Sequence, residues 1–137
     1  MIELILRWGI RGAWAPITVI VIQQLFSRSY EFDWLMHFFG GAAIAFFLYQ
    51  GMLVFDAFFA RPLRILLYII VFGVTCSVVI AWEIGELVSD RFLGSQFQAS
   101  VAETIIDQVC GVFGAIILLA CTAAVEYFIG NQNHRGQ

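Results

Sequence analysis

The chain has 137 residues, of which 61% are hydrophobic and only 12% are charged, and its mean hydropathy is +0.89. A globule of this size cannot bury so much apolar surface, so the composition excludes a soluble domain and predicts an integral membrane protein. There is no lysine, and ten acidic residues outnumber seven arginines, which excludes a general nucleic-acid-binding surface.

The first apolar segment, residues 5–26, carries Arg7 and Arg11 near its start. Its uninterrupted part, Gly12 to Ile22, has 11 residues, whereas a helix needs about 20 to span a bilayer. The two arginines can reach the lipid headgroups from a spanning helix. Alternatively, the segment lies partly in the membrane interface. We expect a span here, with the weakest signal of four.

Three later segments, residues 33–55, 64–86 and 103–129, each predict a transmembrane helix. Between the last two, Ser89 to Ala102 is too polar to cross the membrane and too apolar for a free loop. We expect it to lie at the membrane surface, or to dip into the membrane, as a lid over the helix ends. Residues 131–137 predict a polar tail. The fold class is therefore all-α: a polytopic membrane protein with a bundle of about four helices, forming one integral domain over residues 1–137.

The arginines predict the orientation. With four spans, both termini and the connection around Pro62 lie on one side of the membrane, together with five of the seven arginines: Arg7, Arg11, Arg61, Arg64 and Arg135. The positive-inside rule makes this side cytoplasmic. We therefore expect both termini in the cytoplasm and the ends that carry most of the acidic residues outside.

Six ionisable residues gather at the ends of the last three expected spans: Asp33, His37, Glu83, Glu86, Glu103 and Asp107. Asp33 and His37 are spaced i, i+4 and share a helix face, as do Glu103 and Asp107. Ionisable groups within a span are costly and usually face the bundle or a wet cavity. We therefore expect these side chains to converge, although Asp33 and Glu103 can instead cap helix N-termini.

Glycines lie beside the ionisable residues or one turn deeper: Gly40, Gly41, Gly85, Gly111 and Gly114. Small residues let membrane helices approach closely. Packing alone explains glycines at this spacing, but close approach would also bring the carboxylates together.

Carboxylates with one histidine suit two kinds of chemistry. All six residues are candidate ligands of a divalent metal cation held mainly through oxygen. As a general acid and base, the catalytic candidates are Asp33, His37, Glu83, Glu86 and Asp107. Either chemistry could act on a lipid-linked substrate through activated water or phosphate handling. The sequence contains no G-x-S-x-G, H-E-x-x-H or phosphate-loop motif.

Four motifs occur in order over roughly residues 30–118: Asp33-x3-His37-Phe38, Glu83-x2-Glu86, Phe92-Leu93-Gly94-Ser95-Gln96, and Glu103-x3-Asp107-x3-Gly111-x2-Gly114-Ala115. Together they resemble the VanZ-like membrane proteins and, more closely, a related family of bacterial inner-membrane proteins. The resemblance implies a small helical protein of the bacterial inner membrane. For the VanZ-like group it also implies a link to the cell envelope and glycopeptide antibiotic resistance. It implies no particular reaction.

A structural function is the alternative. The protein would then be a non-catalytic accessory subunit of a larger membrane complex, with its 14 phenylalanines facing protein, pigment or lipid. His37 could in that case ligate a haem or a chlorophyll-type pigment. Ion or proton transport is a third hypothesis, but it needs polar groups at intermediate depth, where only Gln50, Thr75 and Ser77 offer them.

Overall fold

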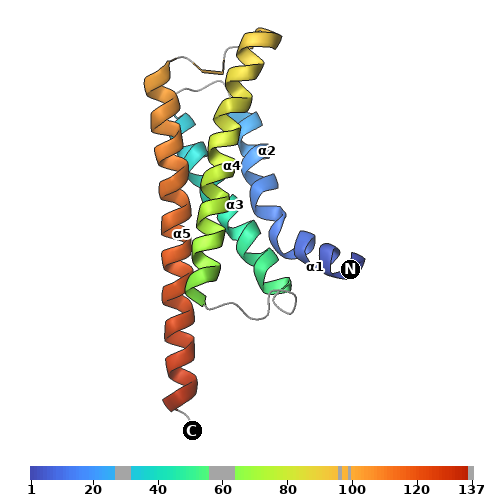
Figure 1. Cartoon of the computed structure of the whole chain (residues 1–137), viewed down its shortest axis with the longest axis vertical. Coiled ribbons are helices and arrows are strands. Elements are labelled where there is room, and N and C mark those ends of the chain that lie inside the picture. Colours follow the sequence, from blue (N-terminus) through green and yellow to red (C-terminus); the bar gives the residue numbers. More distant parts are fainter. Residues whose placement is uncertain (27–31, 56–63, 96, 99, 136–137) are drawn as a thin grey trace.

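The structure, a computed structural model, describes residues 1–26, 32–55, 64–95, 97–98 and 100–135. This part of the chain forms five helices: α1 (Ile2–Gly12), α2 (Trp14–Phe26), α3 (Asp33–Val54), α4 (Arg64–Leu93) and α5 (Val101–Arg135). Figure 1 shows α3, α4 and α5 as an upright bundle, with α2 beside it and α1 projecting sideways. The expected all-α class is confirmed.

Three helices are long and apolar enough to cross a membrane: α3, α4 and the part of α5 up to Ile129. The pair α1 and α2 passes the same test together but is bent by 48°. With 13 residues, α2 alone is about 20 Å long, whereas the hydrocarbon core of a bilayer is about 30 Å thick. The described part of the chain thus has three candidate spans, or four if the bent pair is one span.

The first helix, α1, resembles helices that lie in the membrane interface. Its charged residues, Glu3, Arg7 and Arg11, follow one stripe at i, i+4 spacing, and Arg7 forms an ion pair of 2.6 Å with Glu3. Large apolar residues elsewhere on α1 are exposed. The helix is attached through Trp8, whose ring stacks on Phe47 and whose Nε1 donates to the Phe47 carbonyl at 2.8 Å. This pattern is typical of helices that lie in the plane of the membrane surface.

The closest helix packing joins α3 to α5. A Cβ added at Gly41 would overlap the carbonyl oxygen of Gly111, and one added at Gly114 would overlap that of Phe38. Glycine is therefore required at both positions, because the two backbones are in direct contact. The neighbouring Gly40 has open space beside it.

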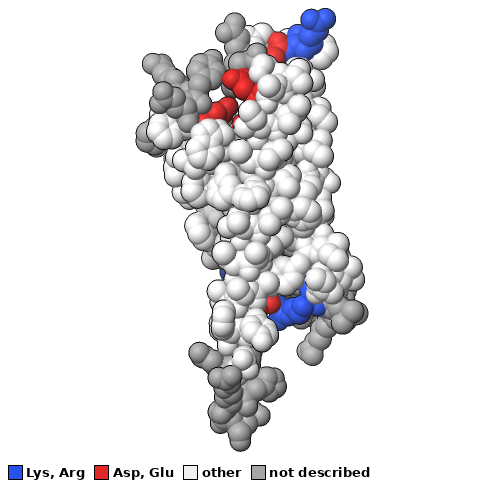
Figure 2. Space-filling view, turned by 90° about the vertical axis from the view of Figure 1, so that its left-hand side faces the viewer, with Lys and Arg blue, Asp and Glu red and all other residues white. Residues whose placement is uncertain are grey.

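Below this contact, the core is small. It comprises the buried residues Ala45, Tyr49, Leu67, Val71, Ala115 and Leu119. Most large apolar side chains are exposed on the outer faces of the helices. Figure 2 shows the result, a broad and almost uncharged belt between two charged ends. This surface suits a protein surrounded by lipid.

Several helix boundaries differ from expectation. The helix expected to end at Glu86 continues to Leu93, because nothing interrupts it before Gly94, whose φ of +71° ends it. The expected surface segment from Ser89 to Ala102 is helical at both ends, where it belongs to α4 and α5. Its place at the membrane surface stays a prediction. The expected polar tail is helical over residues 131–135, where α5 continues. The turn at residues 27–31 and the connection at 56–63 lie outside the described residues, as does Gln96.

Candidate functional site

Three helix ends meet at one end of the bundle, which we call the His37 end. There α3 and α5 begin, while α4, which runs antiparallel to both, approaches its own end (Figure 1). Asp33 and His37 lie in the first two turns of α3, Glu83 lies on α4 and Asp107 lies near the start of α5. These four side chains, which we call the His37 cluster, point inward from three helices.

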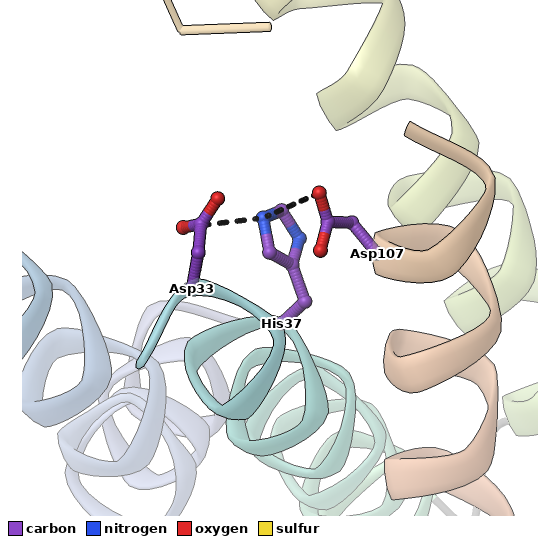
Figure 3. Close-up of side chains that lie close together, drawn as sticks. All are labelled: Asp33, His37 and Asp107. Atoms are coloured by element: carbon purple, nitrogen blue, oxygen red, sulfur yellow. Dashed lines mark ion pairs between the residues drawn. The ribbon is translucent and has the colours of Figure 1, made fainter. Parts of the chain in front are cut away.

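The imidazole of His37 is the centre of this cluster. Its Nε2 lies 3.8 Å from Asp33 Oδ1 and 3.9 Å from Asp107 Oδ2, so the ring stands between two carboxylates (Figure 3). Its Nδ1 lies 3.3 Å from Glu83 Oε1. The side chains of His37, Glu83 and Asp107 are 9%, 2% and 11% exposed, whereas that of Asp33 is 44% exposed. The expected convergence of the helix ends is confirmed.

Glu83 is the most unusual member of the cluster. Within the described part of the chain, neither of its carboxylate oxygens has a hydrogen-bond partner. Although His37 Nδ1 is within ion-pair distance, the two groups do not have hydrogen-bond geometry. A buried carboxylate without hydrogen-bond donors is costly, because the hydrogen bonds that it made to water in the unfolded chain are not replaced. A cation, a proton or an imidazolium is needed to compensate it.

Glu86 and Glu103 lie at the edge of the cluster. Glu86 Oε1 accepts a hydrogen bond of 2.8 Å from Trp82 Nε1, so it already has a partner. Glu103 is exposed, and its carboxylate is not among those that lie close enough to His37 to share a metal ion with it. Its expected role as a metal ligand stays a prediction.

Capping by Asp33 and Glu103 is not what the structure shows. The N-cap of α3 is Phe32, without a side-chain hydrogen bond. At the start of α5, the Glu103 N–H donates to Ser100 Oγ at 3.2 Å, so Ser100 supplies the capping oxygen. Asp33 and Glu103 nevertheless lie in first turns, where the helix dipole favours a carboxylate.

Among the residues that the structure describes, two groups of side chains could hold a metal ion, and both use His37. One group is Asp33, His37 and Asp107; the other is His37, Glu83 and Glu86. In each, the ligand atoms lie within 4.8 Å of one another. Tetrahedral ligands at about 2.1 Å from a metal are about 3.4 Å apart. The distances of 3.8 Å and 3.9 Å in the first group would therefore need to shorten by only a few tenths of an ångström.

A polar cavity of about 170 Å³ adjoins the cluster, and Asp33, Glu86, Gln98, Glu103 and Asp107 are among the residues that line it. Its volume is that of several water molecules, at about 30 Å³ each. Both aspartates of the first group thus border space that a small polar ligand could enter.

The connection after α4 covers this end of the bundle, and Asp90 organises it. The Asp90 carboxylate accepts hydrogen bonds from Ser95 Oγ at 2.7 Å and from the N–H groups of Phe97 and Gln98 at 2.9 Å each. Gln98 Nε2 then donates to the Glu83 carbonyl at 2.9 Å. Asp90 is therefore a structural residue of the connection.

A second polar cluster, which sequence reasoning missed, surrounds Glu126 on α5 near the other end of the bundle. Its Oε1 accepts from Arg64 Nη1 at 2.9 Å and from the Tyr49 hydroxyl, and its Oε2 accepts from the Tyr68 hydroxyl at 2.9 Å. The two tyrosine rings are stacked. A glutamate in an apolar run requires hydrogen-bond donors. The tyrosine hydroxyl groups in the other spans were therefore the signal by which the sequence could have indicated this cluster.

The long apolar helices and the buried cluster define the protein as a helical-bundle integral membrane protein. Within this class, the chain belongs to the family described as "Predicted membrane protein (DUF2238)", whose sequence model matches residues 5–127. The match includes the whole His37 cluster. No curated protein and no solved structure matches the chain. The expected membership of a membrane-protein family is confirmed, and the likeness to VanZ-like proteins stays a prediction.

Proposed function

We propose that the His37 cluster binds one divalent cation through Asp33, His37 Nε2 and Asp107. The observation that carries the proposal is Glu83, a buried carboxylate without hydrogen-bond donors, placed behind an imidazole that two further carboxylates approach. Three acidic groups around one histidine leave an excess of negative charge. A dication between the two aspartates would offset it, because the interior of a membrane protein screens charge poorly.

In this proposal Glu83 orients the histidine and does not touch the metal. A histidine that binds metal through one nitrogen usually donates the other N–H to a carboxylate or carbonyl oxygen. Glu83 Oε1 lies 3.3 Å from His37 Nδ1, so a small rotation would form that hydrogen bond. The bond would hold the ring with Nε2 directed at the cation.

The competing metal group fits less well. It would use Glu83 and Glu86 on the Nδ1 side of His37, and it would draw Glu86 away from its hydrogen bond with Trp82. A neutral imidazole offers only one nitrogen as a ligand. We therefore favour the aspartate group for a single ion.

One nitrogen and two carboxylate ligands suit Zn²⁺ or Mn²⁺. They suit Ca²⁺ less, because that ion takes about six to eight oxygen ligands. Three protein ligands leave a coordination position for water or substrate, which is the arrangement of catalytic rather than structural zinc sites.

We further propose that the open position receives the phosphate of a lipid-linked substrate. The adjoining polar cavity lies at a helix end, which is the depth of lipid headgroups. Hydrolysis is the reaction that such a centre supports. A cation held by Asp33, His37 and Asp107 would polarise the phosphate and favour attack by water at phosphorus. A neighbouring carboxylate would take the proton that this water loses and return it to the leaving oxygen as the bond from phosphorus to that oxygen breaks.

The resemblance to VanZ-like proteins, with their link to the cell envelope, is consistent with this substrate class. The resemblance also supports a place in the bacterial inner membrane. The arginine distribution supports both termini in the cytoplasm and the His37 end outside. Labelling with a membrane-impermeant maleimide tests the orientation in a cysteine-free parent. Phe97→Cys should react in intact cells and Asn131→Cys should not. The reverse pattern would place the cluster in the cytoplasm.

The accessory-subunit alternative gains no specific support from the geometry. Its exposed aromatic side chains are equally expected against lipid. Both imidazole nitrogens of His37 face carboxylates, which leaves the ring poorly placed for haem or pigment. If Asp33→Asn and Asp107→Asn stay folded but leave a larger assembly without any change in metal content, the accessory function replaces ours.

Metal analysis of the detergent-solubilised protein tests the cation site, with Zn²⁺ and Mn²⁺ as probes. We expect one ion per chain, and a loss of affinity of at least about 100-fold in Asp33→Asn, Asp107→Asn and His37→Gln. Glu86→Gln should bind as the parent does, and Glu126→Gln is the control for a charge lost elsewhere.

Two results would contradict this assignment. A folded parent that binds neither ion at micromolar concentration has no such site. If Glu86→Gln loses the ion while Asp33→Asn keeps it, the glutamate group is the true site.

A further inference from the structure

A cavity of about 250 Å³ lies on the other side of His37, between α2, α3 and α4. Gly40, Ile44 and Val79 are among its many apolar or small lining residues. Its only polar linings among the described residues are Gln23, His37 and Trp82. The cavity is therefore apolar along most of its length.

The polar residues mark one end of this cavity. Gln23 is near the end of α2, His37 is near the start of α3, and Trp82 lies one turn before Glu86 on α4. From His37 to Ile44 the wall descends along α3 by two turns, or about 10 Å. The cavity thus has a polar end at the His37 cluster and an apolar end deeper in the bundle.

We propose that this cavity binds a hydrocarbon chain of the same lipid whose phosphate reaches the cation; this inference rests on the proposed function. His37 connects the two sites, because it lines the apolar cavity and also stands between the carboxylates. A ligand with a charged head and a long apolar chain matches both. Within a bilayer, lipids are the molecules with this chemistry.

The free energy of such binding comes mostly from the polar end. A lipid chain that moves from the bilayer into a protein cavity exchanges one apolar environment for another, so the hydrophobic effect contributes little. The cavity then selects by shape, and the phosphate on the cation holds the lipid. Loss of the cation site should release the lipid, whereas a filled cavity should exclude the chain and leave the cation bound.

Gly40→Leu is the variant that separates the two effects. A Cβ at Gly40 meets no atom within 4 Å, so the leucine enters open space at the cavity wall. Gly73→Leu is the matched control, because Gly73 on α4 has equally open space and is not part of the wall. Ile20→Phe, on α2, fills the cavity from the opposite wall and keeps the test independent of α3.

The probe is phosphatidic acid with a photoreactive diazirine in one acyl chain, in vesicles that contain the full-length protein. After illumination, we expect cross-links in the parent at Val19 and Ile44, which line the cavity and are not exposed. Gly40→Leu and Ile20→Phe should lose most of them and keep the parent's metal content. Gly73→Leu should match the parent in both, and His37→Gln should lose both metal and cross-links.

Failure of this inference is distinguishable from failure of the cation proposal. Cross-links that lie on the outer helix faces, or that persist in both filled variants while metal binding is normal, would overturn the lipid cavity alone. The opposite outcome is a parent protein that binds no metal but still shows cavity cross-links, which Gly40→Leu and Ile20→Phe remove. It would support the lipid cavity and overturn the cation site.

Discussion

Glu83 and Glu126 are carboxylates near opposite ends of one bundle, and their surroundings are opposite in kind. Glu126 is 32% exposed yet accepts hydrogen bonds from Tyr49, Tyr68 and Arg64. Glu83 is 2% exposed, and within the described residues its oxygens have no donor. Burial normally raises the need for partners. Here the more buried group has fewer.

The difference separates a structural function from a binding function. The donors around Glu126 come from α3 and α4, so this carboxylate joins three helices and is complete without a ligand. The His37 cluster joins the same three helices but leaves its central charges uncompensated. A cation would complete it.

The largest effect is expected from a change at the contact between α3 and α5, because both the His37 cluster and the cluster around Glu126 include residues of these two helices. In Gly41→Ala the new Cβ overlaps the Gly111 carbonyl, so α3 and α5 must separate. We expect a loss of about 3 kcal/mol in the free energy of unfolding, together with loss of cation binding. Thermal unfolding in detergent measures it. Gly40→Ala is the adjacent control with open space, and equal stability of the two variants would rule out the close packing of α3 on α5.

Glu83→Gln tests the difference between the two glutamates, because it should weaken metal binding without destabilising the metal-free protein. Loss of a carboxylate that orients a ligating histidine typically lowers metal affinity about 10- to 100-fold. The metal-free protein should keep its melting temperature or gain stability, because a buried charge without donors is removed. Titration with Zn²⁺ and a melting curve measure the two effects. A strong loss of metal-free stability would instead show that Glu83 is a structural partner of protonated His37.

The pH dependence of cation affinity is the next largest effect. Imidazole and carboxylate groups bind metal in their deprotonated forms, so protons compete with the ion and affinity falls as the pH is lowered. Where one proton is displaced per ion, affinity should fall about tenfold per pH unit. Calorimetric titrations in buffers of different ionisation enthalpy count the protons released. A cation affinity that does not fall as the pH is lowered would contradict a histidine ligand.

The smallest expected effect is at the Glu126 end. Tyr68→Phe removes one of the donors to Glu126 and leaves the others in place. Interhelical hydrogen bonds in membranes contribute about 0.6 kcal/mol on average. We expect a destabilisation of that size with unchanged cation affinity, as measured by melting and Zn²⁺ titration. A change in affinity would show that the two ends of the bundle are coupled.

By itself, the sequence determined the membrane class, the three long spans and the helix ends at which acidic residues gather. These properties depend on local hydropathy and on positions along the chain, so they can be read without knowing how the helices pack. The spacing of Asp33 and His37 likewise defines a shared face on any helix.

Only the tertiary structure decided which of these residues meet. Asp107 faces His37 while Glu103, one turn earlier, stays exposed, because the contact of α3 with α5 at Gly41 sets how deep in the bundle each turn of α5 lies. The partners of Glu126 come from helices distant in the chain. Which side chains share a space depends on how helices rotate and slide against one another, and that is a property of packing rather than of any single segment.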